Sequence, residues 1–323
     1  MATVPPAGDR PQSKAAPKER RRTDWARWGL GTYFAIFLVF LYAPMMLMAV
    51  LSFQGWPYGG VTWPFKGPIS LTWWKSIFDS SIVQSHANEI SASGKQSLWL
   101  SLAAGAVVAL LAFMLSMAFR RRFRADALAF YLIMLALMTP GYLLSLGTQL
   151  FWRWLGEPTS LWHSALGANV IWGIPFGFLV MLAVWNRYDE HIEEASRDLG
   201  ANQVRTFREV TLPLVWTGIF GSFLFGFTLT WNDYDRTLLL VGGAETQTLP
   251  LTIGGITFTS AIRPDLYALG TATTLVSFFV IVLMLVVTSV RGRFRGAPVH
   301  RVEEELGLGE GLRVPEAPAQ KAG

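Results

Sequence analysis

Long apolar stretches alternate with short polar segments along most of this 323-residue chain. A helix that crosses a membrane needs roughly 20 residues that are mostly apolar and uncharged. Six stretches approach or meet this requirement and predict six transmembrane helices: Trp28–Phe53, Leu98–Phe119, Ala127–Trp152, Ala165–Trp185, Leu214–Trp231 and Leu266–Val290. Because the number of spans is even, we expect both ends of the chain to lie on the same side of the membrane.

Two of the six stretches have unusual lengths. Ala127–Trp152 is longer than one span needs, so we expect its helix to end near Leu146, with Phe151 and Trp152 at the membrane interface. Leu214–Trp231 is only just long enough for one span. Continuation of its helix through the polar residues 232–235 is compatible with the sequence.

The positions of lysine and arginine predict the orientation. With a cytoplasmic N-terminus, 21 of the 27 basic residues lie in cytoplasmic segments and 6 lie outside. Basic residues accumulate on the cytoplasmic side of membrane proteins, so both termini are expected there. The basic clusters 20–22 and 120–122 flank spans, where they meet anionic lipid headgroups. Their placement therefore argues against a nucleic-acid partner, although the net charge is +5.

The amino-acid composition supports a membrane protein. Charged residues make up 15% of the chain, against about 25% in soluble domains, too few to cover a globule with polar groups. Cysteine is absent, which excludes disulfides, thiolate metal sites and a cysteine nucleophile. The four histidines are far apart in the sequence, so no metal site is expected.

Three regions follow from these patterns. Residues 1–27 form a basic tail that is expected to be disordered, residues 28–295 hold the six spans, and residues 296–323 form a second cytoplasmic tail. The longest connection, residues 54–97, contains four tryptophans among glycines and prolines. A docking surface for an extracytoplasmic partner and an aromatic belt at the membrane interface are both compatible with it.

The connection between the fourth and fifth stretches, residues 189–213, combines both charge signs with a helical rhythm. Apolar residues at helical spacing predict two short amphipathic helices, with Ile192, Ala195 and Leu199 on the first and Val204, Phe207 and Val210 on the second. Gly200 suits the left-handed residue that closes a helix, and Pro213 is expected to end or redirect the second helix. Such a pair of helices forms a projecting knob that a partner can grip.

The spacing within this connection resembles the EAA loop of permease subunits of bacterial ABC importers. The residues that carry the resemblance are Glu194, Ala195, Ser196, Gly200, Val210, Leu212 and Pro213. Ser196 stands where the family has a second alanine, which is a small-for-small change. Further segments, residues 139–140, 232–235, 248–250 and 264–270, look like the spermidine/putrescine-type branch of that family, although Gly141 and Tyr142 depart from its usual pattern.

The resemblance implies a fold and a set of partners. The fold would be an all-α membrane protein with a five-helix core of type I and an additional N-terminal helix. The partners would be ATP-binding cassette ATPase subunits, a second and different permease chain, and an extracytoplasmic solute-binding protein, in the bacterial inner membrane. The chain would carry no cofactor, because the partner ATPase binds ATP. Glu194 and Gly200 would set how the knob docks and turns, while Leu212 and Pro213 would transmit its movement.

A small solute, of which a polyamine such as spermidine or putrescine is the leading candidate by resemblance, would cross through this chain. Five residues at the end of the fifth stretch are candidates for the path: Trp231, Asn232, Asp233, Tyr234 and Asp235. An aromatic ring beside carboxylates suits an organic cation. The alternative is structural, with Asp233 paired to Arg236 and Asp235 to a neighbouring helix. Iron, an amino-acid derivative, an opine or a sugar remain alternative solutes.

Other classes of function are less compatible with the residues. The only Gly-Lys pair, Gly94-Lys95, lacks the other positions of a phosphate-binding loop, so the chain is not expected to hydrolyse ATP. A membrane enzyme would need paired acids or a His/Asp cluster, whereas the acids of residues 189–198 alternate with small and apolar residues. A membrane scaffold would not need the polar residues 232–235.

Overall fold

The computed structural model describes residues 25–55, 68–79, 87–121, 123–241, 247–259 and 264–295. The predicted tails, apart from residues 25–27, and residues 56–67 and 80–86 of the tryptophan-rich connection lie outside this part of the chain. The described residues are mostly helical, which confirms the all-α class. The chain divides into two units, residues 1–47 and 48–323, and each is described by itself.

The first unit contains most of one helix, α1 (Trp25–Leu51), which includes a membrane span of 24 residues. The second unit contains the remaining helices: α2 (Thr72–Ser76), α3 (Ala87–Phe119), α4 (Asp126–Met138), α5 (Gly141–Trp154), the π-helical turn Leu161–Ala165, α6 (Leu166–Trp185), α7 (His191–Asp198), α8 (Gln203–Thr206), the π-helical turn Phe207–Thr211, α9 (Leu212–Trp231), α10 (Asp235–Leu238), α11 (Leu249–Thr259) and α12 (Pro264–Arg295).

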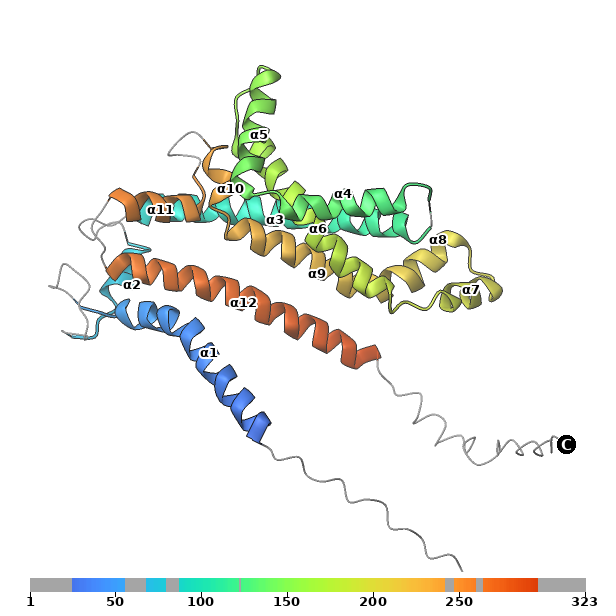
Figure 1. The fold of residues 1–323 in the computed structure, drawn as a ribbon, viewed down its shortest axis with the longest axis horizontal. Coiled ribbons are helices and arrows are strands. Elements are labelled where there is room, and N and C mark those ends of the chain that lie inside the picture. The colour runs from blue at the N-terminus through green and yellow to red at the C-terminus, as the bar shows by residue number, and fades with distance from the viewer. Residues whose placement is uncertain are drawn as a thin grey trace, which may run out of the picture. The chain divides into compact units, whose positions relative to one another are not determined.

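Within the described residues, five helices are long and apolar enough to cross a membrane, and the pair α4 and α5 gives a sixth span if it is counted as one broken helix. The expectation that the third helix continues to Leu146 is wrong. Thr139 takes an extended conformation before Pro140, as pre-proline residues do. The chain therefore bends by 104° between α4 and α5, and α5 stands away from the bundle (Figure 1).

The fifth predicted helix begins earlier than expected, and it ends where the apolar stretch ends. It is continuous from Gln203 to Trp231, so Pro213 neither ends nor redirects it. Pro213 lies in the first turn of α9, where a missing N–H is tolerated, and the π-helical turn before it accommodates the change in hydrogen bonding. At the other end α9 stops at Trp231, and the next helix begins only at Asp235.

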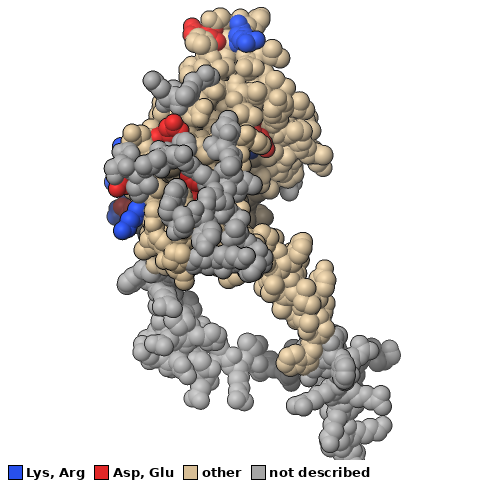
Figure 2. Space-filling view, turned by 90° about the vertical axis from the view of Figure 1, so that its left-hand side faces the viewer, with Lys and Arg blue, Asp and Glu red and all other residues tan. Residues whose placement is uncertain are grey.

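Helices α3, α6 and α9 pack along glycine-rich seams at the centre of the second unit (Figure 1). A Cβ on Gly226 would lie 2.9 Å from the Cα of Gly105, and a Cβ on Gly173 would lie 2.7 Å from Val108. Small residues let helix backbones approach closely in a membrane, where apolar burial gives little preference for helix over lipid. On the face shown in Figure 2, few of the described residues are charged, as expected for contact with lipid.

The segment before α3 packs partly inward. The indole of Trp73 on α2 donates a hydrogen bond of 2.7 Å to the carbonyl of Gln54, and Trp74 stacks on Phe53. Trp73 is 6% exposed, so it lies in the protein core and belongs neither to an open docking surface nor to an interfacial belt. Ser93, in the first turns of α3, is likewise buried.

Candidate functional site

The α6–α9 loop, residues 186–211, forms a helix–turn–helix at one end of the bundle (Figure 1). Gly200 closes α7 with a φ of 90°, which confirms the predicted left-handed position. Its N–H donates to the carbonyl of Arg197 at 2.8 Å, and the N–H of Ala201 donates to that of Ser196 at 3.1 Å. These two bonds form the Schellman motif that ends many helices.

The second helix of the loop starts at a conventional cap. The side chain of Asn202 accepts a hydrogen bond of 2.8 Å from the backbone N–H of Arg205, which satisfies one of the free donors of a helix start. Ser196 and Thr206 then join the two helices through a hydroxyl pair at 3.2 Å. The turn is therefore held by local hydrogen bonds that residues of the loop itself supply.

The apolar residues of the loop face outward. Leu199 is 90% exposed and Val204 is 75% exposed, and Ile192 is also exposed. Phe207, in contrast, packs against Phe113 of α3, with ring centroids 6.2 Å apart. The predicted amphipathic faces are therefore present, but most of their apolar residues do not pack on the chain's own core.

Polar groups attach the loop to the bundle instead. Glu193 of α7 is 15% exposed and accepts hydrogen bonds from Arg120 at 3.0 Å, from Tyr188 at 2.7 Å and from Thr211 at 2.8 Å. Arg120 also reaches Glu190 at 3.3 Å. Burial raises the pKa of Glu193, but these hydrogen bonds and the charge of Arg120 outweigh it and hold that pKa below its ordinary value.

The residues of the predicted coupling motif occupy different environments. Glu194 is exposed and lies 3.1 Å from the ring of His191, and this contact, together with nearby acids, raises the pKa of His191. Ala195 is exposed, whereas Val210 and Leu212 are partly buried at the start of the long helix. The motif thus combines an exposed half on α7 with a half that is continuous with α9.

The other predicted site lies between α9 and α10. Because α9 ends at Trp231, the expected helical face that joins Trp231 to Asp235 does not form. Asp233 is 4% exposed and pairs with Arg236 at 2.9 Å, as the structural alternative predicted. Thr237 also donates to Asp233 at 2.6 Å. Asp235 is exposed, and within the described residues it forms no ion pair with a neighbouring helix.

Arg236 connects several helices at this site. Its Nε donates to Asn169 of α6 at 3.2 Å, one terminal nitrogen donates to the carbonyl of Leu229 at 3.0 Å, and its guanidinium lies 5.1 Å from the ring of Trp172. Ser145 of α5 donates a hydrogen bond of 2.6 Å to the backbone carbonyl of Arg236. The bent helix pair is therefore fastened to α6 and α9 at this point.

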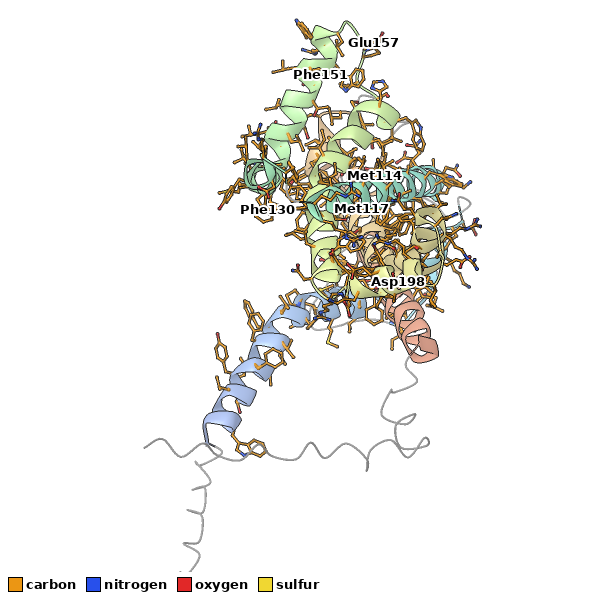
Figure 3. The ribbon with its side chains drawn as sticks, turned by 90° about the vertical axis from the view of Figure 1, so that its right-hand side faces the viewer. Met114, Met117, Phe130, Phe151, Glu157 and Asp198 are labelled. Carbon is orange, nitrogen blue, oxygen red and sulfur yellow. The ribbon has the colours of Figure 1, made fainter. Side chains whose placement is uncertain are left out.

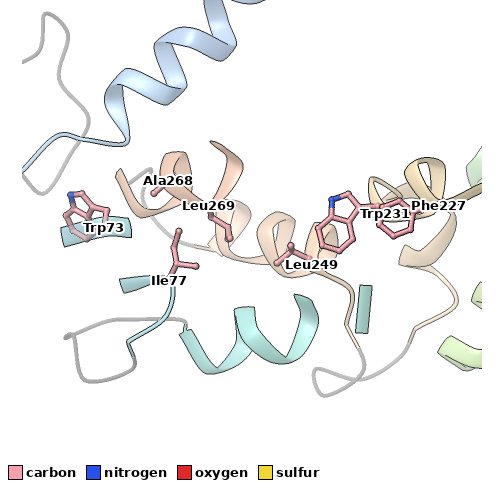
Figure 4. Close-up of a cluster of buried hydrophobic side chains, with 7 residues drawn as sticks. All are labelled: Trp73, Ile77, Phe227, Trp231, Leu249, Ala268 and Leu269. Carbon is pink, nitrogen blue, oxygen red and sulfur yellow. The ribbon is translucent and has the colours of Figure 1, made fainter. Parts of the chain in front are cut away.

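The remaining path candidates are divided between core and surface. Trp231 belongs to a buried cluster with Trp73, Phe227 and Leu249 (Figure 4). The ring of Tyr234 partly fills the space beside a glycine of α11. Asn232 is exposed, and its side chain donates to the carbonyl of Thr228. In this conformation the exposed candidates are therefore Asn232 and Asp235.

Sequence reasoning missed Arg120, Glu193 and Asn169 as site residues. None belongs to a spaced motif, and Arg120 was interpreted only as part of a basic cluster that faces lipid headgroups. The buried pair Arg236–Asp233 was found from its spacing of three residues. Among the described residues, no three His, Cys, Asp or Glu side chains gather where a metal ion could bind.

Comparison with known proteins identifies the class to which this fold and loop belong. The family described as "Binding-protein-dependent transport system inner membrane component" matches residues 101–295. These residues run from the middle of α3 to the end of α12 and include the whole α6–α9 loop. The match defines an inner-membrane, multi-pass component of a transport system.

The chain belongs to this family, and it is a permease subunit of an ABC importer and not an enzyme. It is 25% identical to the spermidine/putrescine transport system permease protein PotC of Haemophilus influenzae over 250 residues, which cover 77% of this chain and 92% of PotC. It is 26% identical to the putrescine transport system permease protein PotI of Escherichia coli over 245 residues, 72% of this chain and 80% of PotI. The resemblance to the spermidine/putrescine-type branch is thereby confirmed.

The fold has a counterpart among solved structures. A chain in the crystal structure of a bacterial ABC transporter involved in the import of the acidic polysaccharide alginate matches with a TM-score of 0.64. The identity is 15%, and the match covers 84% of this chain and 97% of that chain. It supports the arrangement of the helices only.

Proposed function

We propose that this permease couples ATP hydrolysis by a partner ATPase to solute movement through its α6–α9 loop. The observation that carries the proposal is the exposed apolar surface of Ile192, Leu199 and Val204 on a loop whose polar side is fastened to the bundle. Exposed apolar patches mark interaction surfaces. A cytoplasmic ATPase subunit that buries these three side chains would move the loop and, through the continuous helix 203–231, the centre of the bundle.

The proposed complex has five or more chains of four kinds. It contains this permease, a second permease of different sequence, ATP-binding cassette ATPase subunits and an extracytoplasmic solute-binding protein. The family description names a binding-protein-dependent system, which supports the last partner. Both termini of this chain are cytoplasmic in the proposal, and the motif residues Glu194 and Gly200 set the docking and the turn.

The substitution Leu199→Glu tests this docking surface. It places a charge in the proposed apolar contact, and we expect loss of the ATPase subunits from complexes purified through a tag on this chain. Leu155→Glu is the matched control, because Leu155 is also an exposed leucine but follows α5, away from the loop. Retention of the ATPase by Leu199→Glu, or equal loss in the control, would contradict the proposed surface.

We propose a polyamine-like organic cation as the solute. Support comes from the relatives named for spermidine and putrescine transport, and from Asp235, an exposed carboxylate just after the long helix. An exposed carboxylate can pair with a solute ammonium group, whereas Asp233 already pairs with Arg236. Asp235, with Asn232 beside it, is therefore the first candidate for a contact in transit.

Two measurements test the solute. The ligand that copurifies with the cognate binding protein should be a polyamine; iron, an amino-acid derivative, an opine or a sugar would contradict the assignment. Uptake should then fall in Asp235→Asn while the complex stays assembled. Normal uptake in this variant would exclude Asp235 from the path.

A further inference from the structure

Arg120 follows directly after α3 and joins several segments of the loop. Its two terminal nitrogens contact Glu193 at 3.0 Å and Glu190 at 3.3 Å. Its guanidinium also lies 4.5 Å from the ring centre of Trp185 and 5.1 Å from that of Tyr188. One side chain at the end of α3 thus touches the end of α6, the connection to α7, and α7 itself.

Glu193 completes this junction from the opposite side. Its carboxylate accepts from Tyr188 and from Thr211, the residue before α9, in addition to Arg120. It is also 3.8 Å from Arg197, one turn further along α7. Only 17% of the Arg120 side chain and 15% of the Glu193 side chain are exposed, so water screens this pair less than a fully exposed one.

The charged junction matters because, among the described residues, α7 has few other attachments to the bundle. Its apolar residues Ile192 and Leu199 face outward, and the side chain of Ser196 bonds to Thr206, which also belongs to the loop. The second half of the loop is continuous with α9, so movement of α8 reaches α9 through the backbone. Among the described contacts, α7 reaches α3 through Arg120. Figure 3 marks this end of the bundle by Met117 of α3 and Asp198 of α7.

We propose that the contact of Arg120 with Glu193 and Glu190 is a latch that makes α3 move together with the α6–α9 loop when the ATPase moves that loop. Arg120 and Glu193 are positioning residues: they touch neither ATP nor solute. The latch rests on the proposed coupling function. Movement of the loop reaches α9 through the continuous backbone, and the latch would transmit the same movement to α3 through a charge pair. The closely packed helices α3 and α9 would then shift as one body.

The test is the number of solute molecules transported per ATP hydrolysed by the complete complex in proteoliposomes. Without the latch, the ATPase can still move the loop while α3 lags behind. In Arg120→Gln and in Glu193→Gln we therefore expect this ratio to fall about fivefold or more, the lower range of coupling between linked sites. Stimulated hydrolysis itself should change little, because the docking surface is unchanged.

Arg121→Gln is the matched control. Arg121 is the adjacent residue in the same basic cluster, is exposed, and makes no ion pair within the described part of the chain. Its variant should keep the wild-type ratio. An equal fall in Arg121→Gln would show that the net positive charge of the cluster matters, and would overturn the latch.

The double variant separates a pair from two independent residues. If Arg120 and Glu193 act through each other, Arg120→Gln with Glu193→Gln should lower the ratio no further than either change alone. Additive effects of the two changes would overturn the proposal. If Arg120→Gln does not assemble, a wild-type ratio of solute to ATP in Glu193→Gln would overturn it as well. Failure of the proposed function looks different, because the wild-type chain would then not purify with an ATPase at all.

Discussion

The two ends of the bundle each contain an arginine paired with a carboxylate, but the two pairs differ in burial and in what they connect. At the α9–α10 junction, the side chains of Arg236 and Asp233 are 10% and 2% exposed, and the contacts of Arg236 fasten four helices. At the α6–α9 loop, the exposures of Arg120 and Glu193 are 17% and 15%, and the loop they hold presents apolar residues to its surroundings. A deeply buried pair suits a fixed junction, whereas a pair at the edge of water suits a part that a partner moves.

The comparison assumes that the α9–α10 junction and the α6–α9 loop lie on opposite sides of the membrane. Cysteine labelling tests this assumption directly. Because the chain has no cysteine, Glu157→Cys and Gln203→Cys each give a single labelling site, and both positions are exposed. Glu157 follows α5 and Gln203 starts α8 (Figure 3 labels Glu157). An impermeant thiol reagent added outside should label only Glu157→Cys. Labelling of Gln203→Cys and not of Glu157→Cys would show that the orientation is opposite to the one proposed.

Removal of Arg236 should have the largest energetic effect. Arg236→Gln leaves Asp233 buried without its partner charge, and breaking a buried pair on one side costs about 3–5 kcal/mol. We expect a large fall in the thermal unfolding temperature and in the yield of the complex. Arg153→Gln is the control, since Arg153 is an exposed arginine at the end of α5. Equal stability of the two variants would mean that the junction is not fixed by this pair.

Gly200→Val tests whether the geometry of the loop, beyond its presence, matters for coupling. A φ of 90° is unfavourable for valine, and the local cost is more than about 1 kcal/mol. Uptake and stimulated ATPase activity should fall while membrane insertion persists.

Gly156→Val is the matched control, because it introduces the same kind of backbone strain outside the loop. Gly156 has a φ of 80°, and a Cβ at either glycine meets nothing within 4 Å, so the two variants differ mainly in location. We expect Gly156→Val to transport normally. A loss of transport in both would attribute the effect to general strain, and normal uptake in Gly200→Val would reduce the loop to a connector.

The smallest expected effect is a difference in pH response within the loop. The pKa of His191 is raised above 6.5, so its contact with Glu194 is fully present below pH 6.5 and is lost as the pH rises through the higher folded value. The pKa of Glu193 is lowered below 4.5, so its stabilisation is fully present above pH 4.5 and is lost only as the pH falls through the lower folded value.

Histidine NMR on the purified permease checks this response, with His191→Gln to assign the signal. The titration midpoint of His191 should move down towards 6.5 in Glu194→Gln, while Glu193→Gln changes it less, because Glu194 supplies the largest contribution. A midpoint that Glu194→Gln leaves unchanged would contradict the contact.

Much of the architecture could be predicted from local patterns in the sequence. Membrane spans follow from runs of apolar residues because the hydrocarbon core sets a minimum length and excludes charge. The turn at Gly200 follows from its place between two amphipathic segments, since a residue without a Cβ takes a positive φ at little cost. The family follows from the spaced residues 194–213, whose pattern is local and needs no knowledge of the rest of the chain.

Only the tertiary structure decided how the two sites are built. The sequence placed Arg120 in a basic cluster at the membrane edge, and only the packing of α7 beside α3 brings it within 3.0 Å of Glu193, 73 residues away. Likewise, Asp233 and Arg236 are near neighbours in sequence, but their burial depends on Asn169 and Ser145 from other helices. Whether a charge faces lipid, water or a buried partner depends on which helices surround it, and periodicity along one helix does not specify its neighbours.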